Sequence, residues 1–287
     1  MQMKIGKIPK NGEVNSLKIN LRIMKIAIIG GGNMGGAIAR GLTQGTLVAP
    51  SNIRVSDLNE SVLLDLKKYN EAINTTTNNI SAIAGADIVI IAVKPWLVET
   101  VIHQIKLHLD YEKQIVASIA AGITFEHLNA LLEKEGLYPT LFRLIPNTAI
   151  SILESMTIIA SSNASKEQES SIQSIFDELG KSIVVEERLM AAGTSLASCG
   201  TAFALRYVRA AMEGGIELGF YPDAAKEIVA QTVKGAVELL IANGSHPESE
   251  IDKVTTPGGI TIKGLNEMEN AGFTSAVIRG LKASTTK

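Results

Sequence analysis

The feature that most constrains the fold is a glycine-rich turn near the start of the chain. An apolar run, Lys25–Ile29, leads directly into Gly30-Gly31-Gly32-Asn33-Met34-Gly35, and the helix-length segment Met34–Thr43 follows. The spacing G-x-G-x-x-G between a strand and a helix provides a tight turn, close approach of a ligand to the backbone, and close helix–strand packing. The helix start adds free N–H groups and a positive dipole end. In this context the pattern favours a turn that binds the pyrophosphate of a dinucleotide over a merely flexible one.

Short apolar runs alternate with helix-length segments through the first two thirds of the chain. The runs are rich in Ile and Val and largely lack polar alternation, which is typical of strands buried on both faces. This order indicates an α/β fold with a Rossmann-type, parallel, doubly wound sheet. The expected strands are Lys25–Ile29, Asn52–Ser56, Asp87–Val93, Gln114–Ser118, Leu141–Ile145, Met156–Ala160 and Ser182–Val185; the expected helices are Met34–Thr43, Ser61–Lys68, Trp96–Leu107, Thr124–Glu133 and Lys166–Leu179.

The pattern changes after about Glu186. The rest of the chain shows no convincing strand and reads as helices separated by Gly and Pro, so it indicates an all-helical domain. We therefore expect a dinucleotide-binding domain over residues 24–186 and a helical domain over 187–287. Residues 1–23 carry five basic residues and one acid without an apolar stretch. This favours a disordered extension or an upstream start, with the domain beginning at Met24, over a transit peptide.

Composition excludes several classes of function. A hydrophobic fraction of 46% excludes a disordered chain, and a single Cys excludes a disulfide framework or a multi-cysteine metal site. The net charge of −2 gives no basic footprint for nucleic acid. No apolar run approaches the roughly 20 residues of a membrane span. The four His residues lack metal-ligand spacing, so we expect a protein without a metal. We also expect it to be cytoplasmic.

An acidic residue follows the second expected strand. Asp57 lies where a carboxylate accepts hydrogen bonds from the adenosine ribose, and no Arg or Lys lies between Ser56 and Ser61 to receive a 2′-phosphate. Of NADH and NADPH, the sequence therefore favours NADH. The alternative is that Asp57 caps the following turn or helix.

Three further segments carry a family resemblance: Ala92-Val93-Lys94-Pro95, Arg143-Leu144-Ile145-Pro146-Asn147 and Val254-Thr255-Thr256-Pro257-Gly258-Gly259-Ile260-Thr261. From Met24 to about Lys282 the chain resembles the pyrroline-5-carboxylate reductases. The resemblance implies that a nicotinamide cofactor reduces the cyclic imine 1-pyrroline-5-carboxylate to L-proline, the last step of proline biosynthesis. It also implies that the all-helical domain is a dimerisation domain, and hence a homodimer or a higher homo-oligomer.

The Pro-Gly-Gly segment has a physical interpretation of its own. Thr256 is a suitable N-cap and Pro257 a suitable first helical residue. Two adjacent glycines are costly for a simple helix start, which favours an anion site for the substrate carboxylate over a plain cap. The resemblance makes Thr261 the catalytic threonine that hydrogen-bonds the ring nitrogen. Because a threonine hydroxyl is a poor acid, we expect Thr261 to orient the imine. The resemblance adds Glu187 and Lys253, for which a solvated acid at a helix start and a surface lysine are equal alternatives. The expected substrate-binding residues are Glu187, Lys253, Thr256, Gly258, Gly259, Ile260 and Thr261.

The cofactor side combines the glycine turn with residues that the resemblance adds. Asn79 matches a family asparagine near the adenosine, and Ser118-Ile119-Ala120 matches a loop beside the nicotinamide. Lys94 is a candidate partner for a phosphate or the substrate carboxylate. The expected cofactor-binding residues are Ile29, Gly30, Gly31, Gly32, Asn33, Met34, Gly35, Asp57, Asn79, Ala92, Val93, Lys94, Pro95, Ser118, Ile119, Ala120 and Asn147.

Some positions depart from the family pattern. Residues 197–203 read ASCGTAF where the family usually has Ser-Gly-Ser-Gly-Pro-Ala-Tyr, and Trp96 replaces a smaller polar residue. These departures leave a reductase of another cyclic imine open. A β-hydroxyacid dehydrogenase is disfavoured because Met190–Arg206 contains no lysine to act as its acid/base. A nucleotide-sensing regulator would not need the Pro-Gly-Gly segment.

Overall fold

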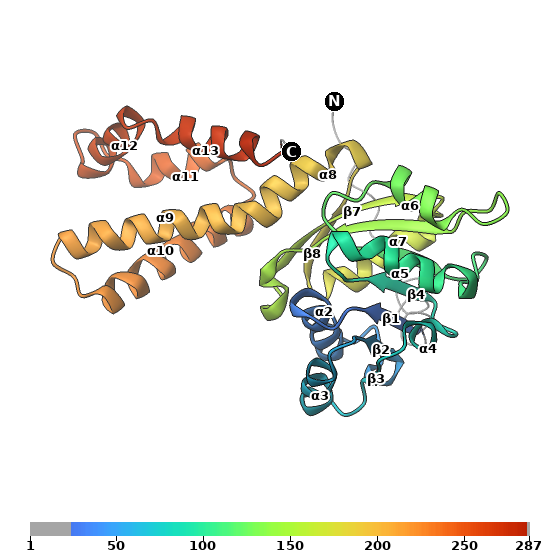
Figure 1. Cartoon of the computed structure of the whole chain (residues 1–287). Helices are drawn as coiled ribbons and strands as arrows, with labels where there is room; N and C mark the ends of the chain where they lie inside the picture. Colours follow the sequence, from blue (N-terminus) through green and yellow to red (C-terminus); the bar gives the residue numbers. More distant parts are fainter. Residues whose placement is uncertain (1–23, 286–287) are drawn as a thin grey trace. The chain divides into compact units, whose positions relative to one another are not determined.

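The computed structural model describes residues 24–285, which form two compact units (Figure 1). The first unit ends at Ser198 and the second begins at Cys199. The extension expected over residues 1–23 lies outside the described residues. Within residues 24–285, no helix is both long enough and apolar enough to cross a membrane.

The first unit is built around one sheet of eight strands, with the order β3-β2-β1-β4-β5-β6-β7-β8. The chain reverses its direction of travel across the sheet between β1 and β4, the position where ligands bind in doubly wound sheets. This arrangement confirms the predicted α/β, Rossmann-type fold. The strands are β1 (Ile26–Ile29), β2 (Ile53–Ser56), β3 (Asn74–Thr76), β4 (Ile88–Ile91), β5 (Ile115–Ser118), β6 (Thr140–Ile145), β7 (Ser155–Ser162) and β8 (Gly180–Val184).

Helices cover both faces of the sheet. In β1, Ile26 and Ile28 belong to one hydrophobic cluster and Ala27 and Ile29 to the other, because successive side chains of a strand point to opposite faces. The first cluster packs against α2 (Asn33–Gln44), α3 (Glu60–Tyr69) and α7 (Lys166–Asp177). The second packs against α4 (Asn79–Ile83), α5 (Val98–Ile105) and α6 (Phe125–Leu132). Double coverage explains why the strands are continuously apolar.

The sheet differs from the sequence prediction in two places. The sheet is mostly parallel, as predicted, but β7 runs antiparallel to β6. The β6–β7 connection holds only the short turn η4 (Thr148–Ile152), whereas a parallel pair needs a crossover of about a dozen residues. The sequence also missed β3, because Asn-Thr-Thr at the sheet edge has no apolar run.

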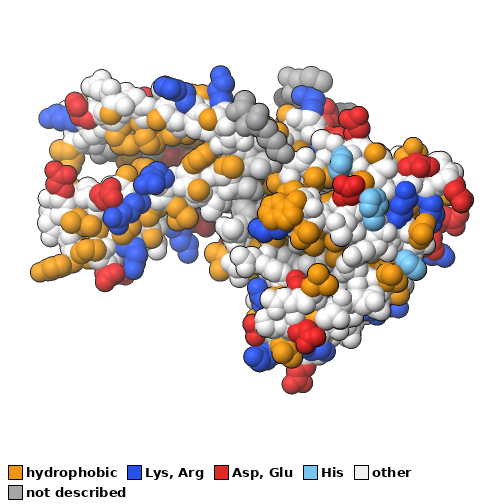
Figure 2. Space-filling model, in the orientation of Figure 1, with side chains coloured by type: hydrophobic (Ala, Val, Ile, Leu, Met, Phe, Trp, Pro, Cys, Tyr) orange, Lys and Arg blue, Asp and Glu red, His pale blue; other side chains and the backbone are white. Residues whose placement is uncertain are grey.

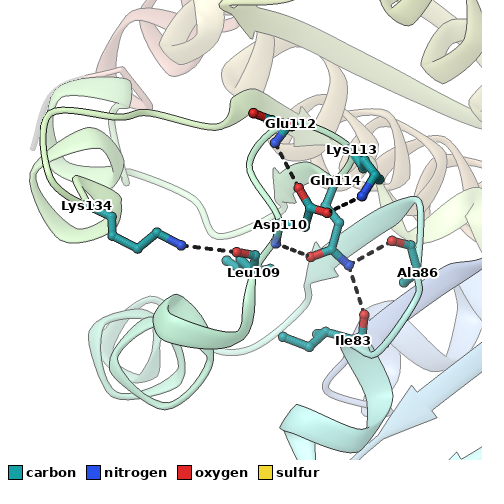
Figure 3. Close-up of polar contacts among 8 residues, drawn as sticks. All are labelled: Ile83, Ala86, Leu109, Asp110, Glu112, Lys113, Gln114 and Lys134. Atoms are coloured by element: carbon teal, nitrogen blue, oxygen red, sulfur yellow. Dashed lines mark hydrogen bonds and ion pairs between the residues drawn. The ribbon is translucent and has the colours of Figure 1, made fainter.

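A buried glutamine ties the loops at the amino ends of β4 and β5 together (Figure 3). Gln114 Nε2 donates hydrogen bonds to the carbonyls of Ile83 (2.9 Å) and Ala86 (2.7 Å), and Gln114 Oε1 accepts one from the backbone N–H of Asp110 (2.9 Å). The Asp110 carboxylate accepts a bond of 2.8 Å from Lys113 Nζ, which holds the pKa of Asp110 below its usual value. These contacts fix the edge of the sheet opposite to the carboxyl ends of the strands.

The chain leaves the sheet through three consecutive turns that remain packed on the first unit. They are η5 (Glu187–Leu189), α8 (Met190–Gly193) and the π-helical η6 (Thr194–Cys199). Met190 and Ala197 belong to the second hydrophobic cluster of the sheet. The compact units therefore divide at the last residue of these turns, between Ser198 and Cys199, later in the chain than residues 186/187, where the sequence pattern changes.

The second unit is entirely helical in its described part. Gly215 allows a close approach of the first two helices, since a Cβ there would lie 3.3 Å from the Cβ of Ala225. Ala225 is the one buried apolar side chain among the described residues of this unit. Figure 2 shows apolar side chains spread over its surface. Such faces require a covering surface. The helices are α9 (Gly200–Glu217), α10 (Pro222–Asn243), α11 (Pro247–Val254), α12 (Ile260–Asn270) and α13 (Phe273–Ala283).

Candidate functional site

The glycine turn joins β1 to α2 at the carboxyl edge of the sheet. Gly30 has a φ of +102°, and its N–H donates to the carbonyl of Ser56 at 2.7 Å. A Cβ on Gly30 would lie 2.6 Å from the carbonyl oxygen of Ala92, and a Cβ on Gly35 would lie 1.9 Å from that of Gly30. Packing within the protein therefore requires glycine at both positions. A Cβ on Gly31 would approach Val62 to 3.0 Å.

Gly32 differs from its neighbours because a Cβ there would meet nothing within 4 Å. It is the N-cap residue of α2, and no side chain in the described residues caps this helix. The start of α2 therefore has no side-chain cap, and its first turn carries no acid. Uncapped N–H groups and open space fit the pyrophosphate of a dinucleotide. The predicted turn from Ile29 to Gly35 is thus assembled with the geometry that such a cofactor requires.

Asp57 lies directly against this turn. Its Oδ2 accepts a hydrogen bond of 2.7 Å from the N–H of Gly31, and its Oδ1 accepts one of 2.8 Å from the N–H of Asn59. The alternative in which Asp57 caps the turn is therefore seen in the structure. An ionised carboxylate has about four acceptor positions, so Asp57 retains acceptor capacity for ribose hydroxyls. The two roles are compatible.

Asn79 bridges β2 and α5. Its Oδ1 accepts a hydrogen bond of 2.8 Å from Ser56 Oγ, and its Nδ2 donates one of 2.8 Å to Gln104 Oε1. Since Ser56 immediately precedes Asp57, Asn79 lies on the expected adenosine side. Ser56 and Gln104 were not predicted from the sequence. The available signal was a serine hydroxyl at the end of an apolar strand, where a buried polar group demands a hydrogen-bond partner.

The ends of β4 and β5 lie beside the glycine turn. The N–H of Ala92 donates to the carbonyl of Ile29 at 2.8 Å, and the N–H of Ile119 donates to the carbonyl of Ile91 at 3.1 Å. Ser118 Oγ accepts a hydrogen bond of 3.3 Å from the N–H of Ala120. The structure therefore brings the predicted segments Ala92–Pro95 and Ser118–Ala120 to the same edge of the sheet as the turn.

Lys94 and Trp96 extend that edge. Both side chains are exposed, and they flank Pro95, which begins η2 (Pro95–Leu97). An exposed cation at the carboxyl end of a strand is suitably placed for an anionic ligand group. The role of Lys94 stays a prediction.

Glu187 has a partner that the sequence analysis did not predict. Its Oε1 accepts a bond of 2.7 Å from Arg143 Nη1 and one of 2.6 Å from the N–H of Phe125. The Arg143 side chain is 8% exposed and that of Glu187 is 37% exposed. A buried guanidinium requires an anionic partner, so an arginine within the apolar strand β6 was the signal for this pair. The substrate-binding role of Glu187 stays a prediction beside this structural contact.

Asn147, at the end of β6, is engaged at both ends of its side chain. Its Nδ2 donates to the carbonyl of Ala197 at 3.1 Å, and its Oδ1 accepts from the N–H of Ala149 at 3.0 Å. These bonds attach the β6–β7 connection to the π-helical turn η6. The structure thus gives Asn147 a positioning contact, and its expected contact with the cofactor is a prediction.

The Pro-Gly-Gly segment corrects one local prediction. Thr256 is not an N-cap and Pro257 is not the first helical residue, because α12 begins at Ile260 with Gly259 as its N-cap. The N–H of Gly259 instead donates to the carbonyl of Thr256 at 2.9 Å, and Gly258 has a φ of +71°. A four-residue turn with Pro second and a positive φ at the third residue is of type II, which requires this glycine.

This turn also explains the second glycine. A Cβ on Gly259 would lie 2.5 Å from Thr256 Oγ1. Both glycines therefore have a structural reason, so they no longer favour an anion site over a plain structural turn, and the anion site stays a prediction. What the segment offers a ligand is the start of α12, which no described side chain caps. Thr261 is exposed on the first turn of that helix.

Lys253 is paired with Glu250 on α11, with Nζ and Oε1 2.7 Å apart. Ser245 and Asn243 also donate to the Glu250 carboxylate, at 2.5 and 3.2 Å. These bonds, led by the one from Lys253, lower the pKa of Glu250 to about 2. The cluster holds the α10–α11 connection and pairs the ammonium group of Lys253 with Glu250. Among the described residues, no group of three or more His, Cys, Asp or Glu side chains is placed to hold a metal.

Comparisons with known proteins agree with the division into two parts. Residues 187–287 match the family described as pyrroline-5-carboxylate reductase dimerisation, and residues 25–122 match NADP oxidoreductase coenzyme F420-dependent. The chain is 40% identical to pyrroline-5-carboxylate reductase 1 of Dictyostelium discoideum over 91% of its length, although it spans only 49% of that protein.

Two further relatives are covered almost completely. Pyrroline-5-carboxylate reductase 2 of Dictyostelium discoideum is 39% identical, with 91% of both chains covered, and pyrroline-5-carboxylate reductase of Methanosarcina acetivorans is 37% identical, with 91% of this chain and 96% of the relative covered.

Solved structures agree with these relatives. A pyrroline-5-carboxylate reductase from Coxiella burnetii has a TM-score of 0.84 at 27% identity, covering 91% of this chain and 96% of its own. The Plasmodium falciparum pyrroline carboxylate reductase with NADP bound has a TM-score of 0.81 at 24% identity, covering 92% and 97% of the two chains, and supports the fold.

Proposed function

Since the chain belongs to the pyrroline-5-carboxylate reductase family, we propose that it reduces 1-pyrroline-5-carboxylate to L-proline with a nicotinamide cofactor. It is an oxidoreductase of the C=N bond. The main support for a dinucleotide cofactor is Gly32. It begins α2 without a side-chain cap, and the space where its side chain would lie is empty. The residues that hold the cofactor are those from Ile29 to Gly35, with Asp57 and Asn79 on the adenosine side. When bound, the cofactor supplies the hydride.

The substrate side belongs to the second unit. The uncapped start of α12 offers N–H groups and a positive dipole end to the substrate carboxylate. Thr261, exposed on the first turn, orients the ring nitrogen by a hydrogen bond of its hydroxyl. Thr256, Gly258, Gly259 and Ile260 shape this turn, and Lys253 adds a positive charge. Much of the rate comes from holding the imine in place, which supplies roughly 7–11 kcal/mol in favourable cases.

The proposal includes a preference for NADH over NADPH. The Asp57 carboxylate would meet the extra negative charge of a 2′-phosphate, and like charges at close range repel. It also includes a homodimer, or a larger homo-oligomer, formed through the helical unit. The exposed apolar side chains of that unit support this, as does its match to a dimerisation family.

The experiment follows cofactor oxidation by the purified full-length chain with 1-pyrroline-5-carboxylate, using NADH and NADPH in separate reactions. Thr261→Ala is expected to lower kcat about 10²-fold, as removal of one positioned hydrogen-bond donor does. Thr232→Ala is the matched control, because this helical hydroxyl donates to the Ile228 carbonyl of its own helix. Cofactor binding without turnover of this imine would contradict the proposed substrate and favour another cyclic imine.

A further inference from the structure

Trp96 is the single tryptophan of the chain, and its side chain is 74% exposed. Its backbone is held firmly. Pro95 begins η2, the N–H of Leu97 donates to the carbonyl of Lys94 at 2.9 Å, and Val98 is fully buried. The indole is therefore presented to solvent by an ordered turn. An ordered turn that presents an indole to solvent offers a ligand a rigid, flat aromatic surface.

The turn that carries Trp96 follows the strand that touches the glycine turn. The N–H of Ala92 donates to the carbonyl of Ile29, and a Cβ on Gly30 would lie 2.6 Å from the oxygen of Ala92. Trp96 follows Ala92 by four residues, so their Cα atoms lie within about 14 Å of one another. This is within the reach of a dinucleotide that starts at the glycine turn.

The order of the strands decides which half of a cofactor Trp96 meets. Asp57 and Asn79 place the adenosine half over β2, on one side of β1. The strands β4 and β5 lie on the other side of β1. A dinucleotide that crosses the switch point therefore has its nicotinamide half over the ends of β4 and β5. Trp96 follows β4 in the chain and the segment Ser118–Ala120 lies at the end of β5, so both come from strands on this side of β1.

We propose that Trp96 packs its indole against the nicotinamide riboside half of the cofactor and so fixes the ring that reacts. This inference rests on the proposed function, since it requires the dinucleotide to bind at the glycine turn. A flat indole provides a stacking surface for a flat ring, and tryptophan attracts cations, such as oxidised nicotinamide, more strongly than the other aromatic side chains. Trp96 is thus a cofactor-binding residue that also excludes water from one side of the ring.

The single tryptophan makes the contact directly measurable. Emission from Trp96 is quenched by acrylamide in the full-length protein, with and without saturating NAD⁺ or NADP⁺, neither of which absorbs that emission. Stacking covers one of the two faces of the indole, so we expect the quenching constant to fall about twofold. ADP, which represents the adenosine half, is expected to leave the quenching unchanged.

A matched variant moves the reporter to the other end of the same connection. Leu107 lies in η3 (Lys106–His108), beyond α5, and is 76% exposed. In the double variant Trp96→Phe/Leu107→Trp, NAD⁺ is expected to leave acrylamide quenching unchanged. By calorimetry, Trp96→Ala is expected to raise the Kd of NAD⁺ about 10-fold, Trp96→Phe less, and Leu107→Ala not at all.

Three results would overturn the inference: NAD⁺ binding with unchanged quenching of Trp96, equal protection by ADP, or protection of Trp96 before any nucleotide is added because a second copy covers it. Failure of NAD⁺ and NADP⁺ to bind would overturn both this inference and the proposed function. Protection of Trp96 by NAD⁺ without reduction of 1-pyrroline-5-carboxylate would support the inference and contradict the proposed substrate.

Discussion

The Asp57 carboxylate accepts a hydrogen bond of 2.7 Å from the backbone N–H of Gly31, so one acid both shapes the glycine turn and lies beside the expected ribose. These two roles are chemically separable. The bond to Gly31 needs an acceptor oxygen, whereas repulsion of a 2′-phosphate needs the negative charge. An amide in place of the carboxylate can retain the bond from Gly31, gives up the one from the N–H of Asn59, and removes the charge.

Asp57→Asn is therefore expected to shift the enzyme toward NADPH while the turn remains folded. We expect the ratio of kcat/KM for NADH to that for NADPH to fall about 10-fold. This corresponds to a free-energy difference of roughly 1.4 kcal/mol between the two cofactors. Asp57→Ala, which also leaves the N–H of Gly31 without this acceptor, should lower the thermal midpoint as well. An unchanged ratio in Asp57→Asn would show that the carboxylate does not select the cofactor.

Alanine substitution is expected to have opposite effects at two glycines of the turn, lowering cofactor affinity at one and protein stability at the other. Gly32→Ala places its methyl group in open space, so stability should change by no more than about 1 kcal/mol, while cofactor affinity falls sharply. Gly35→Ala places its methyl group 1.9 Å from the carbonyl oxygen of Gly30, and overpacking of this kind costs about 3 kcal/mol. Urea unfolding and calorimetric titration with NADH separate the two effects. Full cofactor affinity in Gly32→Ala would contradict the pyrophosphate site.

The fold could be predicted from local sequence patterns wherever a strand is buried along its whole length. The β1 run, the glycine turn and the alternation with helices are dictated by residues close in sequence, and the doubly wound sheet follows from them. The direction of β7 depended instead on the short β6–β7 connection. Contacts such as Asn147 to Ala197 join residues far apart along the chain, and sequence spacing contains no record of them. The Thr256–Gly259 turn was misread because a helix cap and a type II turn favour the same Thr-Pro start.

The ion pair between Arg143 and Glu187 yields a prediction about stability and one about the substrate. Glu187→Gln leaves a buried guanidinium without its anion, and we expect a loss of about 2 kcal/mol, less than for a fully buried pair because Glu187 is partly exposed. Replacing both residues, as Arg143→Met/Glu187→Gln, should recover part of this loss. Chemical unfolding of the single and double variants measures the coupling.

The same double variant tests the substrate role of Glu187. If Glu187 binds the imine substrate, the KM for 1-pyrroline-5-carboxylate remains raised in the double variant even where stability recovers. A KM equal to that of the unmodified protein would restrict Glu187 to its contact with Arg143. Thermal unfolding under assay conditions verifies that both proteins are folded during the measurement.

The Glu250 cluster predicts how the helical unit responds to acid. Hydrogen bonds from Lys253, Ser245 and Asn243 lower the pKa of Glu250 from its ordinary value of 4.5 to about 2. Because the folded state holds the charged form more strongly than the unfolded state, this contribution is complete above a pH of about 4.5. It is lost as the pH falls from 4.5 towards 2.

We expect the thermal midpoint followed by circular dichroism to fall over this pH window, and to fall less in Glu250→Gln, which cannot change its charge. Glu248→Gln, on the same helix and exposed, is the matched control and should retain the full acid dependence. Equal pH profiles for the unmodified protein and Glu250→Gln would mean that other carboxylates set the acid response. A lower midpoint for Glu250→Gln at neutral pH is also expected, because an amide is a weaker acceptor than a carboxylate for the Lys253 ammonium that holds the α10–α11 connection.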